Sequence, residues 1–114
     1  MIILCILLSS IGIANAQHSI ARQWNEQLLE AIRRDFARPT VHARNLFHTS
    51  MGMYDAWAAF DSEATTYFLG NTSGEYGSSF DGINSPENVK SAQEEAISYV
   101  ACRLIIHRFA SAPN

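Results

Sequence analysis

The side chains best suited to chemistry gather between residues 42 and 61. Arg44, His48, Met51 and Asp55 follow one another at steps of four, three and four, which places them on one stripe of a helix. His48 and Asp55 are separated by two turns, roughly 10.5 Å along the axis at about 1.5 Å per residue, so they cannot touch directly. We expect a stripe of structural hydrogen bonds here. The alternative, the wall of a ligand site, stays open.

The other acidic and imidazole groups of this segment do not combine into a site. His42 points about 120° away from His48 around the helix, so the two do not make a metal pair. Asp55 and Asp61 diverge by a similar angle, which excludes paired carboxylates. We expect Asp61 to close the helix and Asp55 to accept hydrogen bonds from an arginine of a neighbouring helix. With no turn to present a nucleophilic serine, the sequence predicts no catalytic, cofactor-binding or metal-binding residue.

Two amphipathic helices must position these groups. The first begins at Ser19, a capping residue, and its apolar side chains recur at steps of three and four until Pro39 stops it; they are Ala21, Trp24, Leu28, Ile32 and Phe36. The second runs from Thr40 to about Asp61 and is apolar over about half its circumference. Its other side carries Gly52, Ala56 and Ala59. Because glycine weakens a helix, Gly52 favours close approach by another element.

A long loop precedes the third helix. Between Asp61 and Ser85 glycine, asparagine and serine mark turns, although residues 65–69 could be a short extended piece. Ser85-Pro86 predicts the start of the third helix, and Ala110 begins the exit loop. The predicted fold class is therefore all-α, with three helices forming part of a larger helical bundle and a long irregular loop between the second and third.

The first residues have the pattern of an export signal. An apolar run from Ile2 to Ile13 is followed by Ala14-Asn15-Ala16, a small-x-small cleavage pattern, so we expect residues 1–16 to be a signal peptide. The mature chain, residues 17–114, would be secreted or periplasmic and free of the membrane. Cys102 is its one thiol and is expected to be a buried small hydrophobe. A net charge of −3 and a single lysine argue against nucleic-acid binding.

Three stretches resemble a known family. They are WNEQLLEAIRRDFARPTVHARNLFH at 24–48, YDAWAA at 54–59 and AQEEAISY at 92–99. They are similar to the N-terminal region of secreted bacterial proteins related to vanadium-dependent haloperoxidases, which belong to the type-2 phosphatidic acid phosphatase superfamily. The resemblance covers most of residues 19–113 and all three helices in order.

The motifs that hold the oxyanion in that family are absent from the chain. In Lys-x6-Arg-Pro, Ala31 stands where the lysine would precede Arg38-Pro39, and the Pro-Ser-Gly-His and Ser-Arg-x5-His motifs do not occur. The resemblance implies that vanadate binds residues outside this chain. The partner of residues 17–114 would then be the missing C-terminal catalytic helices of the same protein. Residues 17–114 would be an incomplete, non-catalytic N-terminal segment of a haloperoxidase or an acid-phosphatase-like enzyme. The alternative is a small secreted helical protein that binds a partner or forms a homo-oligomer.

Overall fold

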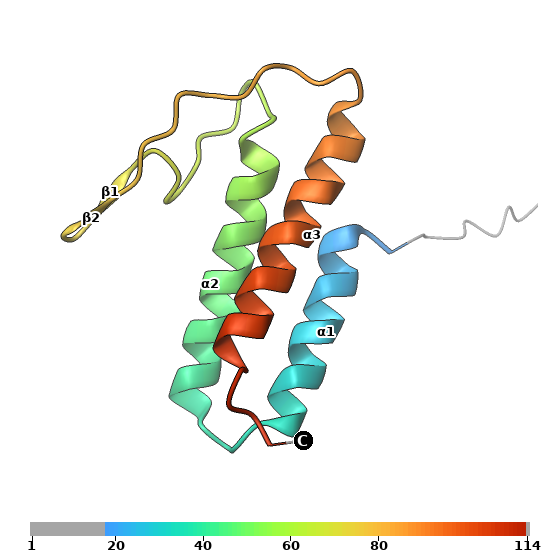
Figure 1. Ribbon diagram of the computed structural model, residues 1–114, viewed down its shortest axis with the longest axis vertical. Helices are drawn as coiled ribbons and strands as arrows, with labels where there is room; N and C mark the ends of the chain where they lie inside the picture. Colours follow the sequence, from blue (N-terminus) through green and yellow to red (C-terminus); the bar gives the residue numbers. More distant parts are fainter. Residues whose placement is uncertain (1–17, 114) are drawn as a thin grey trace, which may run out of the picture.

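The computed structural model describes residues 18–113 and is mostly helical (Figure 1). Its helices are α1 (Ile20–Arg34), α2 (Pro39–Ala58) and α3 (Val89–Arg108). The three predicted helices are confirmed. The prediction of an all-α chain is corrected by β1 (Thr72–Ser73) and β2 (Tyr76–Gly77), which pair antiparallel inside the long loop. The expected signal peptide at 1–16 lies outside the described residues.

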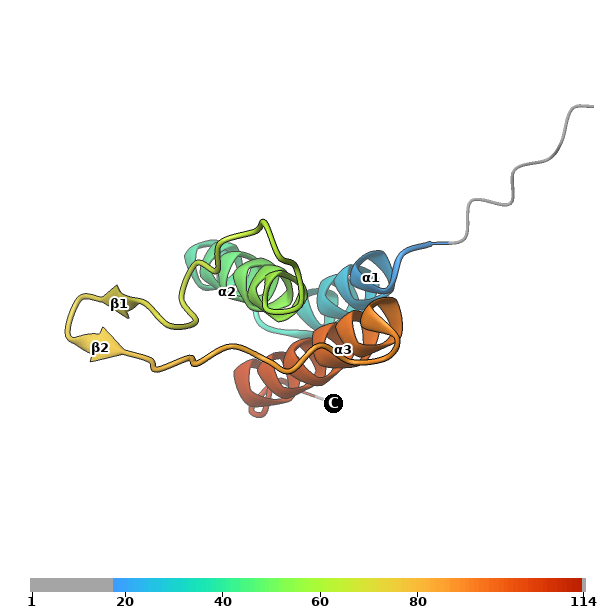
Figure 2. The same cartoon turned by 90° about the horizontal axis from the view of Figure 1, so that it is seen from above.

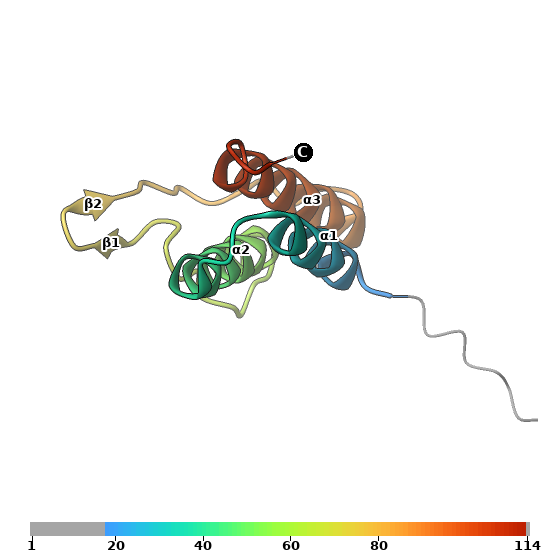
Figure 3. The same cartoon turned by 90° about the horizontal axis from the view of Figure 1, so that it is seen from below.

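The helices run alternately down, up and down in Figure 1, and α3 lies along both of the others (Figures 2 and 3). The core between them is small and consists largely of Met53, Ala56, Ile97 and Ala101, with Trp24 and Val100 packed against it. Leu28 of α1 is fully buried. No helix within residues 18–113 has the length and apolar character needed to cross a bilayer.

The helix boundaries follow local chemistry, with two clear departures from the sequence prediction. α1 ends at Arg34 and does not continue to Pro39, so Phe36, expected on its apolar stripe, lies beyond the helix and is 61% exposed. The Ser19 hydroxyl accepts a hydrogen bond from the Arg22 N–H at 3.3 Å, which confirms the cap of α1. Pro39 occupies the first turn of α2, one residue before the predicted start. The predicted start of the third helix at Ser85-Pro86 is wrong. α3 begins three residues after Pro86, where the side chain of Asn88 accepts from the Ser91 N–H at 3.0 Å.

Gly52 lies at a close contact between α2 and α3. A Cβ atom at this position would lie 2.8 Å from Val100 Cγ1 and 2.9 Å from Leu104 Cδ1. The predicted close approach is confirmed, and the neighbour is α3. The residues at 45, 49, 52 and 56 therefore form the side of α2 that the bundle covers.

The loop between α2 and α3 is extended at a different place from the one predicted. Residues 65–69 form bends and a turn, because their backbone N–H groups bond to a side chain of α2. The strand pair lies further on, with Thr72 opposite Gly77 and Ser73 opposite Tyr76. Gly74, at φ 63°, supplies the left-handed residue of the tight connection. Figure 1 shows this hairpin projecting from the side of the bundle.

Candidate functional site

Asp55 is the most deeply buried charged residue of the predicted stripe and anchors the long loop to α2. Only 7% of its surface is exposed. Its carboxylate accepts hydrogen bonds from the backbone N–H groups of Tyr67, Phe68 and Leu69, the last two at 2.8 and 2.9 Å. The prediction of an arginine donor is therefore wrong, because three consecutive backbone donors occupy the carboxylate. Asp55 therefore has a structural role, because its carboxylate oxygens already accept hydrogen bonds from the loop.

The His48 side chain points toward α3 and does not point toward Asp55. Its Nδ1 atom accepts a hydrogen bond from the Arg108 guanidinium at 2.7 Å. Burial lowers the pKa of His48, and the charges of Arg108 and Arg44 lower it further. The neutral imidazole is thus favoured, and the contact joins the lower parts of α2 and α3. Arg44 itself is exposed and Met51 is half-buried, so the four residues do not converge on one cavity.

His42 and Asp61 also have local partners. His42 Nε2 lies 2.9 Å from the Phe36 carbonyl oxygen, to which it donates, and its ring stacks on Phe109 with the ring centres 6.3 Å apart. Asp61 accepts from the N–H groups of Glu63 and Ala64, both at 2.9 Å. These donors follow it in the loop, and α2 ends at Ala58, so the prediction that Asp61 closes the helix is wrong. Among residues 18–113 no three His, Cys, Asp or Glu side chains are grouped to hold a metal ion.

Sequence reasoning missed the polar layer inside the bundle. Asn45 and Thr49 are 2% and 1% exposed, although neither residue type is common in a core. Asn45 Oδ1 has no hydrogen-bond partner within the described residues. The missed signal was spacing, since Asn45 and Thr49 continue the row of Gly52 and Ala56 at steps of four, three and four.

The opposite side of α2 carries a row of uncharged side chains that the described residues cover only in part. We call it the α2 seam; it consists of Ala43, Phe47, Ser50, Tyr54 and Trp57. Phe47 is 46% exposed, Tyr54 38% and Trp57 37%. The loop covers part of the seam, through T-shaped ring contacts of Tyr67 and Phe68 with Phe47 and a hydrogen bond from the Tyr54 hydroxyl to the Thr65 carbonyl oxygen. The seam is therefore a candidate interaction surface.

A second uncovered surface lies on the side of α3 that faces away from α2. This α3 outer face consists of Tyr99, Cys102 and Ile106, of which Tyr99 is 68% and Ile106 65% exposed. Between this face and α1 runs a groove of about 370 Å³, which Cys102 lines together with Trp24 and Ile105. The thiol expected to be buried is thus half-buried in a groove wall.

Comparison with known proteins adds no assignment to these surfaces: no family model, no curated protein and no solved structure matches the chain.

Proposed function

We propose that residues 17–114 are the N-terminal helical scaffold of a secreted haloperoxidase-like enzyme and form part of a larger helical bundle. The sequence resemblance over 24–48, 54–59 and 92–99 suggests the family. The observation that carries the proposal is the exposure of large apolar side chains on two faces of the helical unit. Contiguous apolar surface of this kind is uncommon on monomeric proteins and marks places where another element packs. We assign the catalytic helices of the parent protein to the α3 outer face.

Within residues 18–113, the side chains nearest in type to an oxyanion site do not suit vanadate. Ala31 has no charge to offer an oxyanion, and the His48–Arg108 contact is closed by its own hydrogen bond. Arg33 and Arg34 bond to Glu30. We therefore attribute no reaction step to this chain, and the choice between haloperoxidase and phosphatase chemistry depends on the residues of the parent protein that bind the oxyanion.

The coding DNA beyond codon 114 tests the proposal directly. An in-frame continuation that encodes the three oxyanion motifs is the expected result. A stop codon immediately after Asn114 in the intact gene would contradict the proposal.

Activity measurements separately test the proposal that this chain catalyses no reaction. The purified chain, supplied with vanadate, hydrogen peroxide and bromide, should oxidise no bromide above the buffer rate. Turnover above that rate, abolished by omitting vanadate, would show that this chain carries a site of its own.

A second function is favoured by the α2 seam. A small secreted helical protein could act by binding alone, through a surface that is apolar and one helix wide. The spacing of the seam residues supports this alternative.

A further inference from the structure

The α2 seam has the spacing with which one helix packs along another. Its five positions, 43, 47, 50, 54 and 57, alternate steps of four and three. This is the period of a coiled-coil seam, in which side chains insert between those of a single facing helix. None of the five residues is charged. The seam spans about 21 Å at about 1.5 Å per residue, enough for four turns of a partner helix.

The two ends of the seam are complementary in side-chain size. Turning a second seam end to end about Ser50 places Ala43 opposite Trp57 and brings Phe47 within one residue of Tyr54. At each end of the pair a small residue then faces a large one, as close packing requires. A parallel pairing would instead put Trp57 against Trp57 and leave a gap between the two Ala43 side chains. The seam therefore matches a second copy in the antiparallel orientation.

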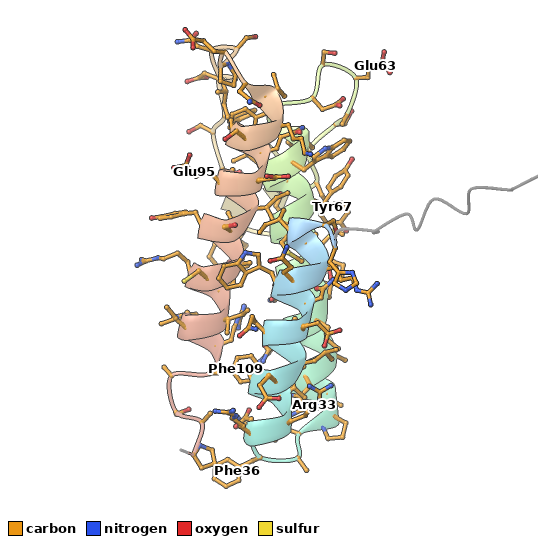
Figure 4. The ribbon with its side chains drawn as sticks, turned by 90° about the vertical axis from the view of Figure 1, so that its right-hand side faces the viewer. Arg33, Phe36, Glu63, Tyr67, Glu95 and Phe109 are labelled. Carbon is orange, nitrogen blue, oxygen red and sulfur yellow. The ribbon has the colours of Figure 1, made fainter. Side chains whose placement is uncertain are left out.

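The charges of the bundle favour the same orientation. Six arginines and two carboxylates lie toward the end where α1 meets α2; they are Arg33, Arg34, Arg38, Arg44, Arg103 and Arg108, with Glu30 and Asp35. Six carboxylates and one lysine lie toward the other end; they are Asp55, Asp61, Glu63, Glu87, Glu94 and Glu95, with Lys90. Figure 4 shows Arg33 at the first end and Glu63 and Glu95 at the second. An antiparallel pair aligns opposite charges, whereas a parallel pair aligns like charges.

We propose that a second copy of this chain docks on the α2 seam in the antiparallel orientation, with the two-fold axis at Ser50. The interface is isologous, so each seam contributes the same residues. The proposal goes beyond the scaffold function and does not depend on it, because the α3 outer face points away from the seam and stays free.

Cysteine cross-linking tests the position of the axis. In a Cys102→Ala background, Ser50→Cys should form a disulfide-linked dimer under mild oxidation, since the two Ser50 positions face each other. Ala43→Cys should not, because its two copies would lie roughly 21 Å apart along the axis. Ser91→Cys, on an exposed turn of α3, measures the yield from random collision. Linking of Ala43→Cys as efficiently as Ser50→Cys would indicate a parallel pair, and yields of Ser50→Cys no higher than those of Ser91→Cys would overturn the proposal.

Sedimentation of the full chain tests the surface itself. At rising concentration the mass should approach that of two chains. Phe47→Asp should raise the dissociation constant by about tenfold or more, whereas Ile106→Asp on the α3 outer face should leave it unchanged. A chain that stays monomeric throughout, or a dimer that Phe47→Asp leaves intact, would refute the proposal. If Phe47→Asp loses its helical circular dichroism, the cross-linking result decides. None of these outcomes bears on the coding DNA beyond codon 114, so the scaffold function is judged separately.

Discussion

At the scale of single residues, Asp55 holds the long loop against the helices. One carboxylate satisfies three successive backbone N–H groups, of Tyr67, Phe68 and Leu69. Tyr54 adds a fourth contact, because its hydroxyl donates to the Thr65 carbonyl oxygen at 2.9 Å. The loop can therefore lie on α2 without forming regular structure of its own.

Asp55→Asn should release this loop. An amide offers one acceptor oxygen in place of two, so buried N–H groups lose their partners, at a cost of about 1–3 kcal/mol in the free energy of unfolding. Urea denaturation measures that cost, and hydrogen exchange of the Tyr67–Leu69 amides should accelerate. The matched control is Asp61→Asn, whose two N–H partners, Glu63 and Ala64, lie earlier in the loop, and it should leave the exchange of the Tyr67–Leu69 amides unchanged. Equal acceleration in both variants would argue against the anchor.

Because His48 accepts a hydrogen bond from Arg108, we expect the free energy of unfolding to fall in acid. Burial and the nearby arginines lower the pKa of His48, so the folded chain binds a proton less readily than the unfolded chain. The stability that this histidine contributes is present above the unfolded-state pKa, about 6.5, and is lost as the pH falls toward the lower folded-state pKa. His48→Gln should flatten the pH dependence of the free energy of unfolding in this window, measured by urea denaturation. His107→Gln, at an exposed position on α3, should leave the pH dependence of the free energy of unfolding as steep as in the unmodified chain.

At the scale of helices, Gly52 sets the distance between α2 and α3. Gly52→Ala gains about 1 kcal/mol of helix propensity. The added methyl group would nevertheless meet Val100 Cγ1 at 2.8 Å, and a β-branched side chain in a helix has little freedom to turn away. We expect a net destabilisation of about 1–3 kcal/mol from overpacking, measured by thermal or urea denaturation. Adding Val100→Ala should recover part of the loss. A stabilised single variant would show that the two helices can separate without cost.

The sequence predicted those features of the helices that local chemistry decides. Ser19 and Pro39 act within one turn of their own position, and Gly52 could be interpreted because its cost requires a close neighbour. The partner of Asp55 could not be predicted, because it lies twelve to fourteen residues away in a loop without periodicity. Asn45 was missed for a related reason, since polarity suggests exposure and only the position of α3 places it inside. The start of α3 depended on a choice between two caps, Ser85 and Asn88, that propensity alone does not settle.

At the scale of the whole molecule, three helices cover only part of one another. α3 takes the small-residue side of α2, and α1 packs mainly against α3, so large side chains on the aromatic side of α2 and the outer side of α3 stay partly exposed in the described structure. The charges are also divided between the two ends of the bundle, which gives the chain a dipolar field along its long axis. Apolar area supplies the attraction between two such units, and this field selects their relative direction.

Salt should therefore weaken the antiparallel dimer. Attraction between opposite ends acts through solvent and is screened over about 10 Å at moderate ionic strength, whereas the apolar contacts of the seam are not screened. The dissociation constant, measured by sedimentation at a series of salt concentrations, should rise with added salt. Arg44→Gln removes an exposed charge next to the seam and should raise the constant at low salt but converge with the unmodified chain at high salt. Arg103→Gln removes the same charge from α3, farther from the seam, and should have the smaller effect. A dimer that tightens with added salt would instead bring like ends together, which requires the parallel orientation.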